Sequence, residues 1–197
     1  MKRYYLPALQ PDQGAHNNYY DTYTRPSHLS KNQATQKDID KRYKQHKAWK
    51  LNQGLGCELE LECEDLKDIS LYSFDCRGIN FGWSDLRGMV LSKLKNQMTE
   101  CNFTACKLDN AEMMYMNLSG CSFQSASLVD VDFTGSIFEC VRFDYANLTG
   151  STFKGCKFIC CSFNYANIKG VYFDPKAKVK EVSWVGTNRE VKQHELF

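Results

Sequence analysis

The stretch FDYANLTG, residues 143–150, returns twenty residues later as FNYANIKG, residues 163–170, with five of the eight letters identical. This echo belongs to a longer pattern. Steps of five from Phe103 to Phe173 give fifteen consecutive positions that all carry a large apolar residue. Two positions before each of them the residue is almost always small or thin. Repeats are the first signal to look for in a sequence, so this double period of 5 and 20 decides the fold.

A period of five matches neither the 3.6 of a helix nor the 2 of a plain strand. The five positions fit a strand segment that ends at a corner: a small inward residue, a polar one, a large inward residue and then a two-residue turn. Corners that need positive φ favour glycine, and five glycines occupy the turn position: Gly120, Gly135, Gly150, Gly155 and Gly170. Four such units complete one coil, so residues twenty apart lie above one another at the spacing of about 4.7–4.9 Å between sheet strands.

The pattern predicts a core of stacked columns in which like side chains lie on like. The columns are Phe103, Phe123, Phe143 and Phe163; Leu108, Leu128, Leu148 and Ile168; Phe133, Phe153 and Phe173, after Met113; and Phe138 and Phe158, after Leu118.

These repeats resemble the pentapeptide-repeat family, whose motif A(D/N)LXX is seen here as Ala146-Asn147-Leu148 and Ala166-Asn167-Ile168. The resemblance covers at least residues 99–175 and implies an all-β fold, a right-handed quadrilateral β-helix. It also implies a binding role, because known members include secreted effectors and DNA-mimicking proteins that act on type II topoisomerases.

The chain divides into three parts. Residues 1–56 are predicted to form a polar, basic N-terminal extension, extended or disordered over 1–36 and with a short helix at 37–50. Residues 57–175 are predicted to form the β-helix, with a small insertion near 92–97, because Leu91 and Met98 lie seven residues apart instead of five. Pro175 ends the repeats, and residues 176–197 are expected to form a short C-terminal cap, since a solenoid needs a capped end.

Charge is distributed unevenly along the chain. Residues 1–54 hold ten Lys/Arg and four Asp/Glu, a balance of +6, whereas residues 58–75 hold seven acids and one lysine, a balance of −6. No apolar run reaches the roughly 18 residues of a membrane helix, and the start of the chain lacks the apolar stretch of a secretory signal. We therefore expect no membrane span, and either a cytoplasmic protein or one exported as an effector through its polar leader.

The ten cysteines include no Cys-x-x-Cys pair, so we expect small buried fillers and reduced thiols instead of a metal site. Cys140 and Cys160, at turn positions, are the predicted accessible thiols. The four histidines, His16, His28, His46 and His194, all lie outside the repeats and are expected to be solvated. With no phosphate loop, metal constellation or catalytic set, the sequence predicts neither an enzyme nor a cofactor.

Several outward side chains are candidates for a partner-facing surface. They are Tyr145, Tyr165, Asp130, Asp132, Asp144 and Glu139. The alternative is that the acids serve solubility and the tyrosines only stack along the ladder. The tyrosine-rich leader contains no recognised DNA or RNA motif, so we do not expect direct nucleic-acid binding.

Two functions are consistent with these features. The first is a non-catalytic, protein-binding scaffold, in one form a delivered bacterial effector. The second, which the family resemblance implies, is a DNA-mimicking inhibitor or protector of a type II topoisomerase such as gyrase, which requires a homodimer through the C-terminus. Residues 58–75 favour the second function, and the basic leader argues against it.

Overall fold

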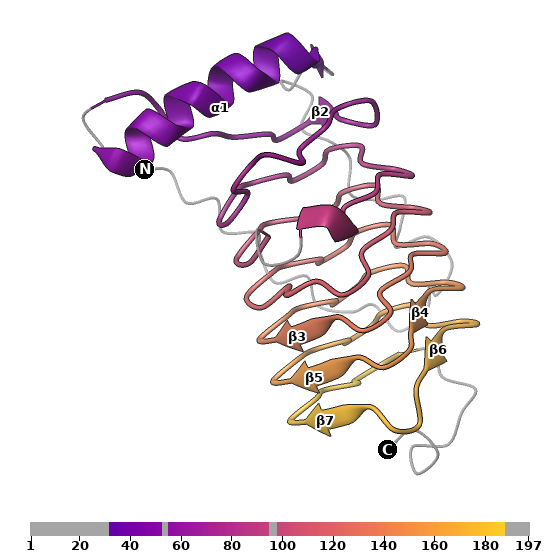
Figure 1. Ribbon diagram of the computed structural model, residues 1–197. Coiled ribbons are helices and arrows are strands. Elements are labelled where there is room, and N and C mark those ends of the chain that lie inside the picture. Colours follow the sequence, from indigo (N-terminus) through magenta and orange to yellow (C-terminus); the bar gives the residue numbers. More distant parts are fainter. Residues whose placement is uncertain (1–31, 53–54, 95–97, 188–197) are drawn as a thin grey trace.

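The computed structural model describes residues 32–52, 55–94 and 98–187. Figure 1 shows a stack of coils with helix α1 (Gln36–Leu51) across its N-terminal end. Strands β3 (Ile137–Glu139), β5 (Lys157–Ile159) and β7 (Lys178–Lys180) lie above one another on one face. Strands β4 (Thr152–Phe153) and β6 (Tyr172–Phe173) form a ladder of their own.

From the third coil on, a coil pairs with the next at four places, all with parallel register. The bridges Ser122↔Arg142, Ser127↔Asn147 and Asp132↔Thr152 and the partners Ile137↔Lys157 each join residues twenty apart. Successive bridges are five residues apart along the chain, so one coil has four sides. The predicted quadrilateral β-helix is therefore confirmed.

The register changes in two places. Val90 pairs with Glu112, twenty-two residues on, and the extra residues fall next to the short 3₁₀ helix η2 (Ser92–Leu94). Near the C-terminus, Lys157 of β5 pairs with Lys178 of β7, twenty-one residues on. Both insertions are absorbed at corners, so the columns on either side keep their alignment.

The corners are held in the left-handed backbone region. All five turn glycines predicted from the sequence have positive φ, between 66° and 74°. Within the described ranges, thirteen non-glycine residues share this conformation, among them Tyr115, Tyr145 and Tyr165, with φ of 56°, 61° and 58°. Positive φ is uncommon outside glycine, so the ladder bonds on either side must hold these corners in place.

Helix α1 closes the N-terminal end of the stack. Thr35 caps it by accepting a hydrogen bond from the Asp38 backbone N–H, and Ile39 is fully buried against the first coil. Before the helix, β1 (Asn32–Gln33) pairs in parallel with β2 (Glu64–Asp65). Residues 32–33, in the segment predicted to be extended or disordered, are thus extended and paired with the first coil, whereas residues 1–31 lie outside the described residues.

The coil continues beyond Pro175, where the sequence placed the last repeat. Strand β7 extends the sheet of β3 and β5, and Ser183 pairs with Ser162. Trp184 then takes the place of the next column residue, because its ring stacks on Phe163 at 4.4 Å between centroids. The expected cap thus includes further coil, and residues 188–197 lie outside the described part.

Candidate functional site

The axis of the stack is filled by the predicted columns. All thirteen residues proposed as core are buried, with at most 8% of any side chain exposed. Phe123, Phe143 and Phe163 stack in parallel, with centroid separations of 5.2 and 4.7 Å. Rings of neighbouring columns meet edge to face, as Phe143 and Phe153 do at 5.9 Å. Because these side chains fill the interior, only the outward side chains can contact other molecules.

The small inward positions join one coil to the next. Ser136 donates its hydroxyl to the Met113 carbonyl at 2.7 Å and accepts from the Met116 backbone N–H at 2.9 Å. Cysteines replace serine at other such positions: Cys106 lies 2.8 Å from the Phe81 carbonyl. Burial raises the pKa of the Cys156 thiol to about 12. These thiols are structural and are not poised as nucleophiles.

Two cysteines at turn positions are exposed, as the sequence predicted for Cys140 and Cys160. Cys160 donates a hydrogen bond to the Glu181 carboxylate at 3.1 Å. That bond raises the pKa of the Cys160 thiol, because ionisation would place two negative charges in contact. The thiol is therefore accessible but unactivated.

An aromatic corner, which we define as Tyr145, Tyr165 and Val185, follows the phenylalanine column. Tyr145 and Tyr165 stack with centroids 5.1 Å apart and an angle of 11° between planes. Tyr165 is 36% exposed and Val185 59% exposed. Asp144 lies beside this corner, where its carboxylate accepts from the Ser162 hydroxyl and the Asn164 backbone N–H, both at 2.9 Å.

The remaining candidate acids lie elsewhere on the coil, so the structure does not bring the six residues into one surface. Asp130 lies in the corner after the leucine column, with φ of 53°, and Asp132 lies on the side that follows, where it accepts from the Thr134 backbone N–H. Glu139 lies two corners further along the coil and forms an ion pair with Lys157 at 2.9 Å. Only Asp144 shares a corner with the two tyrosines.

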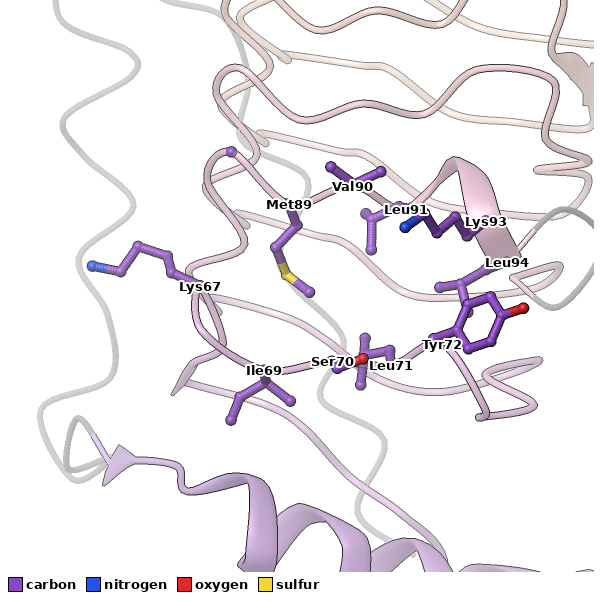
Figure 2. Close-up of a pocket in the computed structure, with 11 residues that line it drawn as sticks. Lys67, Ile69, Ser70, Leu71, Tyr72, Met89, Val90, Leu91, Lys93 and Leu94 are labelled. Carbon is purple, nitrogen blue, oxygen red and sulfur yellow. The ribbon is translucent and has the colours of Figure 1, made fainter.

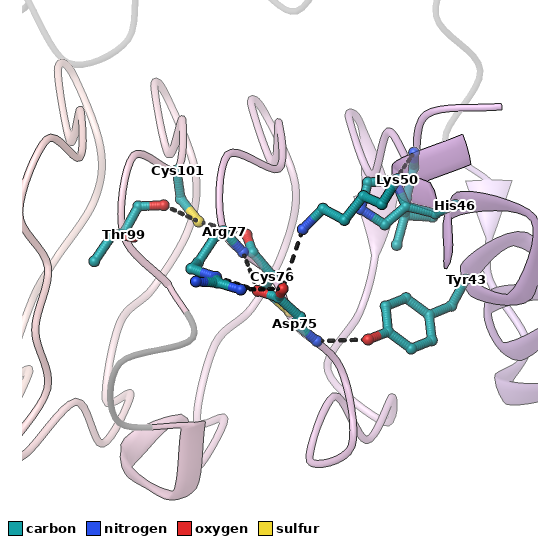
Figure 3. A network of polar contacts seen from close by, with 9 residues as sticks. Tyr43, His46, Lys50, Asp75, Cys76, Arg77, Thr99 and Cys101 are labelled. Carbon is teal, nitrogen blue, oxygen red and sulfur yellow. Dashed lines mark hydrogen bonds and ion pairs between the residues drawn. The ribbon is translucent and has the colours of Figure 1, made fainter. Parts of the chain in front are cut away.

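The acidic segment that starts the β-helix is engaged by the basic helix above it. Arg42 of α1 contacts Glu64 at 2.7 Å, and Lys50 contacts Asp75 at 3.2 Å. Figure 3 shows Asp75 between Lys50 and Arg77. Hydrogen bonds from Arg77, together with Lys50, hold the pKa of Asp75 far below its usual value. The opposite charges noted along the sequence thus meet within the molecule.

His46 corrects the expectation that the histidines are solvated. It lies on the buried side of α1, only 2% exposed, and its Nδ1 accepts a hydrogen bond from the Leu59 backbone N–H at 3.0 Å. Burial, and then the charge of Lys50, lower the pKa of His46. His46 shares the buried face of the helix with Ile39, and its bond to Leu59 could not be predicted from the sequence. The other three histidines lie outside the described residues.

One feature was not predicted from the sequence: a break in the ladder between the first two coils. A pocket of about 420 Å³ opens there, lined from one coil by Lys67 and 69–72 and from the next by 88–91, Lys93 and Leu94. In Figure 2 these two groups lie on opposite walls of the opening.

The described ranges contain neither a metal-binding cluster nor a membrane-spanning helix. No three His, Cys, Asp or Glu side chains there are placed to hold a metal ion. No helix in the same ranges is both long and apolar enough to cross a bilayer.

The repeats are similar to a known family of repeat proteins. A family model described as a pentapeptide repeat region matches residues 96–173. No curated protein matches the chain. Among solved structures, Rfr23 from the cyanobacterium Cyanothece 51142 is 16% identical with a TM-score of 0.44, over 56% of this chain and 84% of Rfr23.

Two further solved structures are similar over part of their length. HetL, a pentapeptide repeat protein involved in heterocyst differentiation regulation in Nostoc sp. Strain PCC 7120, is 13% identical with a TM-score of 0.43, over 65% of this chain and 54% of HetL. Trypsin-treated QnrB1, a plasmid-mediated fluoroquinolone resistance protein, is 16% identical with a TM-score of 0.42, over 52% of this chain and 64% of QnrB1.

Proposed function

We propose, because this chain is a pentapeptide-repeat protein, that it is a non-catalytic scaffold that binds a protein partner through its corners. The aromatic corner is the observation that carries the proposal. Tyr145 and Tyr165 are stacked and therefore fixed in place, and Val185 adds exposed apolar surface on the next coil. Aromatic side chains in a fixed geometry are the usual anchors of protein interfaces.

The surroundings of the aromatic corner have the polar rim of an interface. The Asp144 carboxylate is oriented by two hydrogen bonds, and Asn164 accepts from the Ser183 hydroxyl and the Val185 backbone N–H. The polar side chains are therefore ordered before a partner arrives. Such preorganisation reduces the entropy lost on binding.

A capture experiment with matched variants tests this proposal. The full chain is used as bait against a lysate of its source cells, and the Tyr165→Ala variant is compared with Tyr115→Ala. Tyr115 is 68% exposed at a different corner, so it controls for the loss of any surface tyrosine. We expect Tyr165→Ala to lose a specific partner that Tyr115→Ala retains. Equal retention by both variants would contradict the proposal.

The alternative function, DNA mimicry toward a type II topoisomerase, requires a free acidic face. The ion pairs of α1 with Glu64 and Asp75 reduce the acidity of the first coil, which favours the scaffold. A gyrase supercoiling assay separates the two: inhibition or protection by the full chain at micromolar concentration would support DNA mimicry. Dimerisation through the C-terminus, which that role needs, is tested by sedimentation in the same preparation.

A more specific version of the scaffold proposal is that the protein is delivered as a bacterial effector. It depends on the polar leader, and residues 1–31 are the part to test, because 32–36 pack on the first coil. A reporter fused to residues 1–31 should be exported if the leader is an export signal. Retention of the reporter would remove this form and leave the scaffold role in place.

A further inference from the structure

The ladder between the first two coils is intact on two sides and interrupted on the third. Glu60 pairs with Asn80 and Asp65 with Asp85. By the same register Ser70 should pair with Val90, but these two residues form no bridge, although Val90 pairs normally with Glu112 on its other side. The pocket of about 420 Å³ lies at this break, within the roughly 300–1,000 Å³ typical of ligand sites.

Backbone groups of both walls face the break. Gln36 of α1 bonds both backbone groups of Ser70, accepting from its N–H at 2.7 Å and donating to its carbonyl at 3.1 Å. The alternation of a strand then directs the Ile69 carbonyl and the Leu71 N–H toward the second coil. There Met89 and Leu91 bond to Glu112 of the third coil, which directs both backbone groups of Val90 back toward the first coil.

These four groups have no hydrogen-bond partner within the described part of the chain: the Ile69 carbonyl, the Leu71 N–H, and the N–H and carbonyl of Val90. In an unbroken ladder Leu71 would donate to Val90, and Val90 to Ile69, as Leu66 and Asp85 do with their partners at 2.9 Å. Each wall is therefore the edge of a strand that lacks its neighbour. Such edges are templates for an added strand.

We propose that this break, which we call the ladder gap, binds an extended peptide segment of a partner protein as one inserted strand. This rests on the proposed function only in that the partner is a protein. A central peptide residue would donate to the Ile69 carbonyl and accept from the Leu71 N–H. The residues before and after it would bond to the N–H and carbonyl of Val90, so one short segment satisfies both walls.

The side chains of the walls define the sequence that fits. The residues on either side of the central one would turn their side chains inward, beside Ile69 and Met89 and then beside Leu71 and Leu91. These four wall side chains are apolar and buried. The fitting segment is therefore apolar, polar, apolar, which is the pattern of the chain's own repeat.

Charge sets the direction of the peptide. Both walls run from the Lys67 end toward the Lys93 end, so a parallel insert has its C-terminal end at Lys93. Lys67 already contacts Asp65 at 3.3 Å and Asp85 at 4.0 Å, whereas Lys93 forms no ion pair within the described ranges. An acidic residue after the second apolar residue would pair with Lys93.

The gap itself is tested by amide hydrogen exchange on the full chain. Leu91 is the internal control, because its N–H donates to the Glu112 carbonyl at 2.8 Å. We expect the Val90 and Leu71 amides to exchange faster than that of Leu91. Val90 protection equal to that of Leu91 without added peptide would overturn the proposal, whether the gap is closed or is filled by a second copy or by the chain's own leader.

Binding is tested by titrating an acetylated, amidated Ala-Thr-Leu-Asp peptide and following the Leu71 and Val90 amides by NMR. We expect saturable shifts at both residues. The Val90→Pro variant removes a donor that makes no bond in the fold, and it should lower the affinity about tenfold. Val90→Thr retains the N–H and should bind normally. An unchanged thermal midpoint verifies that each variant is folded.

A charge reversal gives a second, independent check. Lys93→Glu should weaken the Ala-Thr-Leu-Asp peptide and strengthen Ala-Thr-Leu-Lys, whereas Lys67→Glu should change neither by as much. Absence of saturable shifts, or full binding by Val90→Pro, overturns the proposal. Neither result bears on the Tyr165→Ala capture experiment, so failure of the ladder gap and failure of the scaffold role can be told apart.

Discussion

Replacing Phe143 by alanine should destabilise the chain more than replacing Phe103. Both side chains are fully buried, and each stacks between two rings of its own column, Phe143 at 5.2 and 4.7 Å and Phe103 at 5.1 and 4.9 Å. The loss of buried surface and the cavity that remains are therefore matched. A buried Phe→Ala change costs about 3–5 kcal/mol, and we take about 3 kcal/mol for Phe103.

The two sites differ in their neighbouring columns. Phe143 makes edge-to-face contacts with three further rings, at 5.4, 5.9 and 6.2 Å, whereas leucine and methionine fill the corresponding positions around Phe103. An aromatic pair contributes at least about 0.5 kcal/mol beyond its buried area. Three such contacts add about 1.5 kcal/mol, so Phe143→Ala should cost about 4.5 kcal/mol.

Urea unfolding followed by circular dichroism measures the difference directly. In a thermal scan, a chain of this length loses about 2–4 °C per kcal/mol, so Phe143→Ala should melt roughly 3–6 °C below Phe103→Ala. Equal costs would show that the edge-to-face contacts add nothing beyond burial. Costs below about 1 kcal/mol for both variants would refute the inward placement of the columns.

Three other outcomes are expected. Because the pKa of His46 is lowered in the fold, the unfolded chain binds the proton more tightly, so stability should fall as the pH drops below about 6.5. His46→Asn, whose Oδ1 can replace Nδ1 as the acceptor for the Leu59 N–H, should flatten that part of a plot of urea midpoint against pH. Gly78→Ala should lower the free energy of unfolding by about 1 kcal/mol, because Gly78 has a positive φ. Gly135→Ala should lower it by about 0.5–1.5 kcal/mol more, because the new Cβ would lie 2.5 Å from the Tyr115 ring. Urea unfolding of both variants measures the difference. In the native state a thiol reagent should modify only the three exposed cysteines, Cys57, Cys140 and Cys160. The seven buried cysteines should react only after the protein is unfolded.

The repeats could be predicted because the interactions that set them are local in sequence. A five-residue unit fixes one side and one corner, and a twenty-residue register fixes the stack. Helix α1 was also visible, at 37–50 against the observed Gln36–Leu51. Its docking was not, since it depends on a tyrosine that stacks on Phe74 at 3.9 Å and on a buried histidine, neither of which forms a strong apolar stripe.

The continuation past Pro175 was missed because one extra residue shifts the period. Val179 pairs with Phe158, and Trp184 follows Phe163 by twenty-one, so a search that allowed a single insertion would have found both. The ladder gap, in contrast, is not accompanied by any shift of the five-residue period in the sequence. Leu71 and Leu91 keep the column in phase, so the missing bridge between Ser70 and Val90 does not disturb the repeat in the sequence.

The corners are where this fold leaves its sequence free to vary. Inward positions are restricted by stacking, and the sides by the ladder, but a corner residue needs only to tolerate positive φ. Here glycine, alanine, serine, asparagine, tyrosine, cysteine and acidic residues all do so, because the bonds between coils impose the conformation on them. Corners can therefore change without loss of the stack, whereas the acidic first coil is already paired with its own helix. Partner choice should depend on what the corners present, and exchanging Tyr145 and Tyr165 for serine should alter capture without moving the thermal midpoint by more than a few degrees.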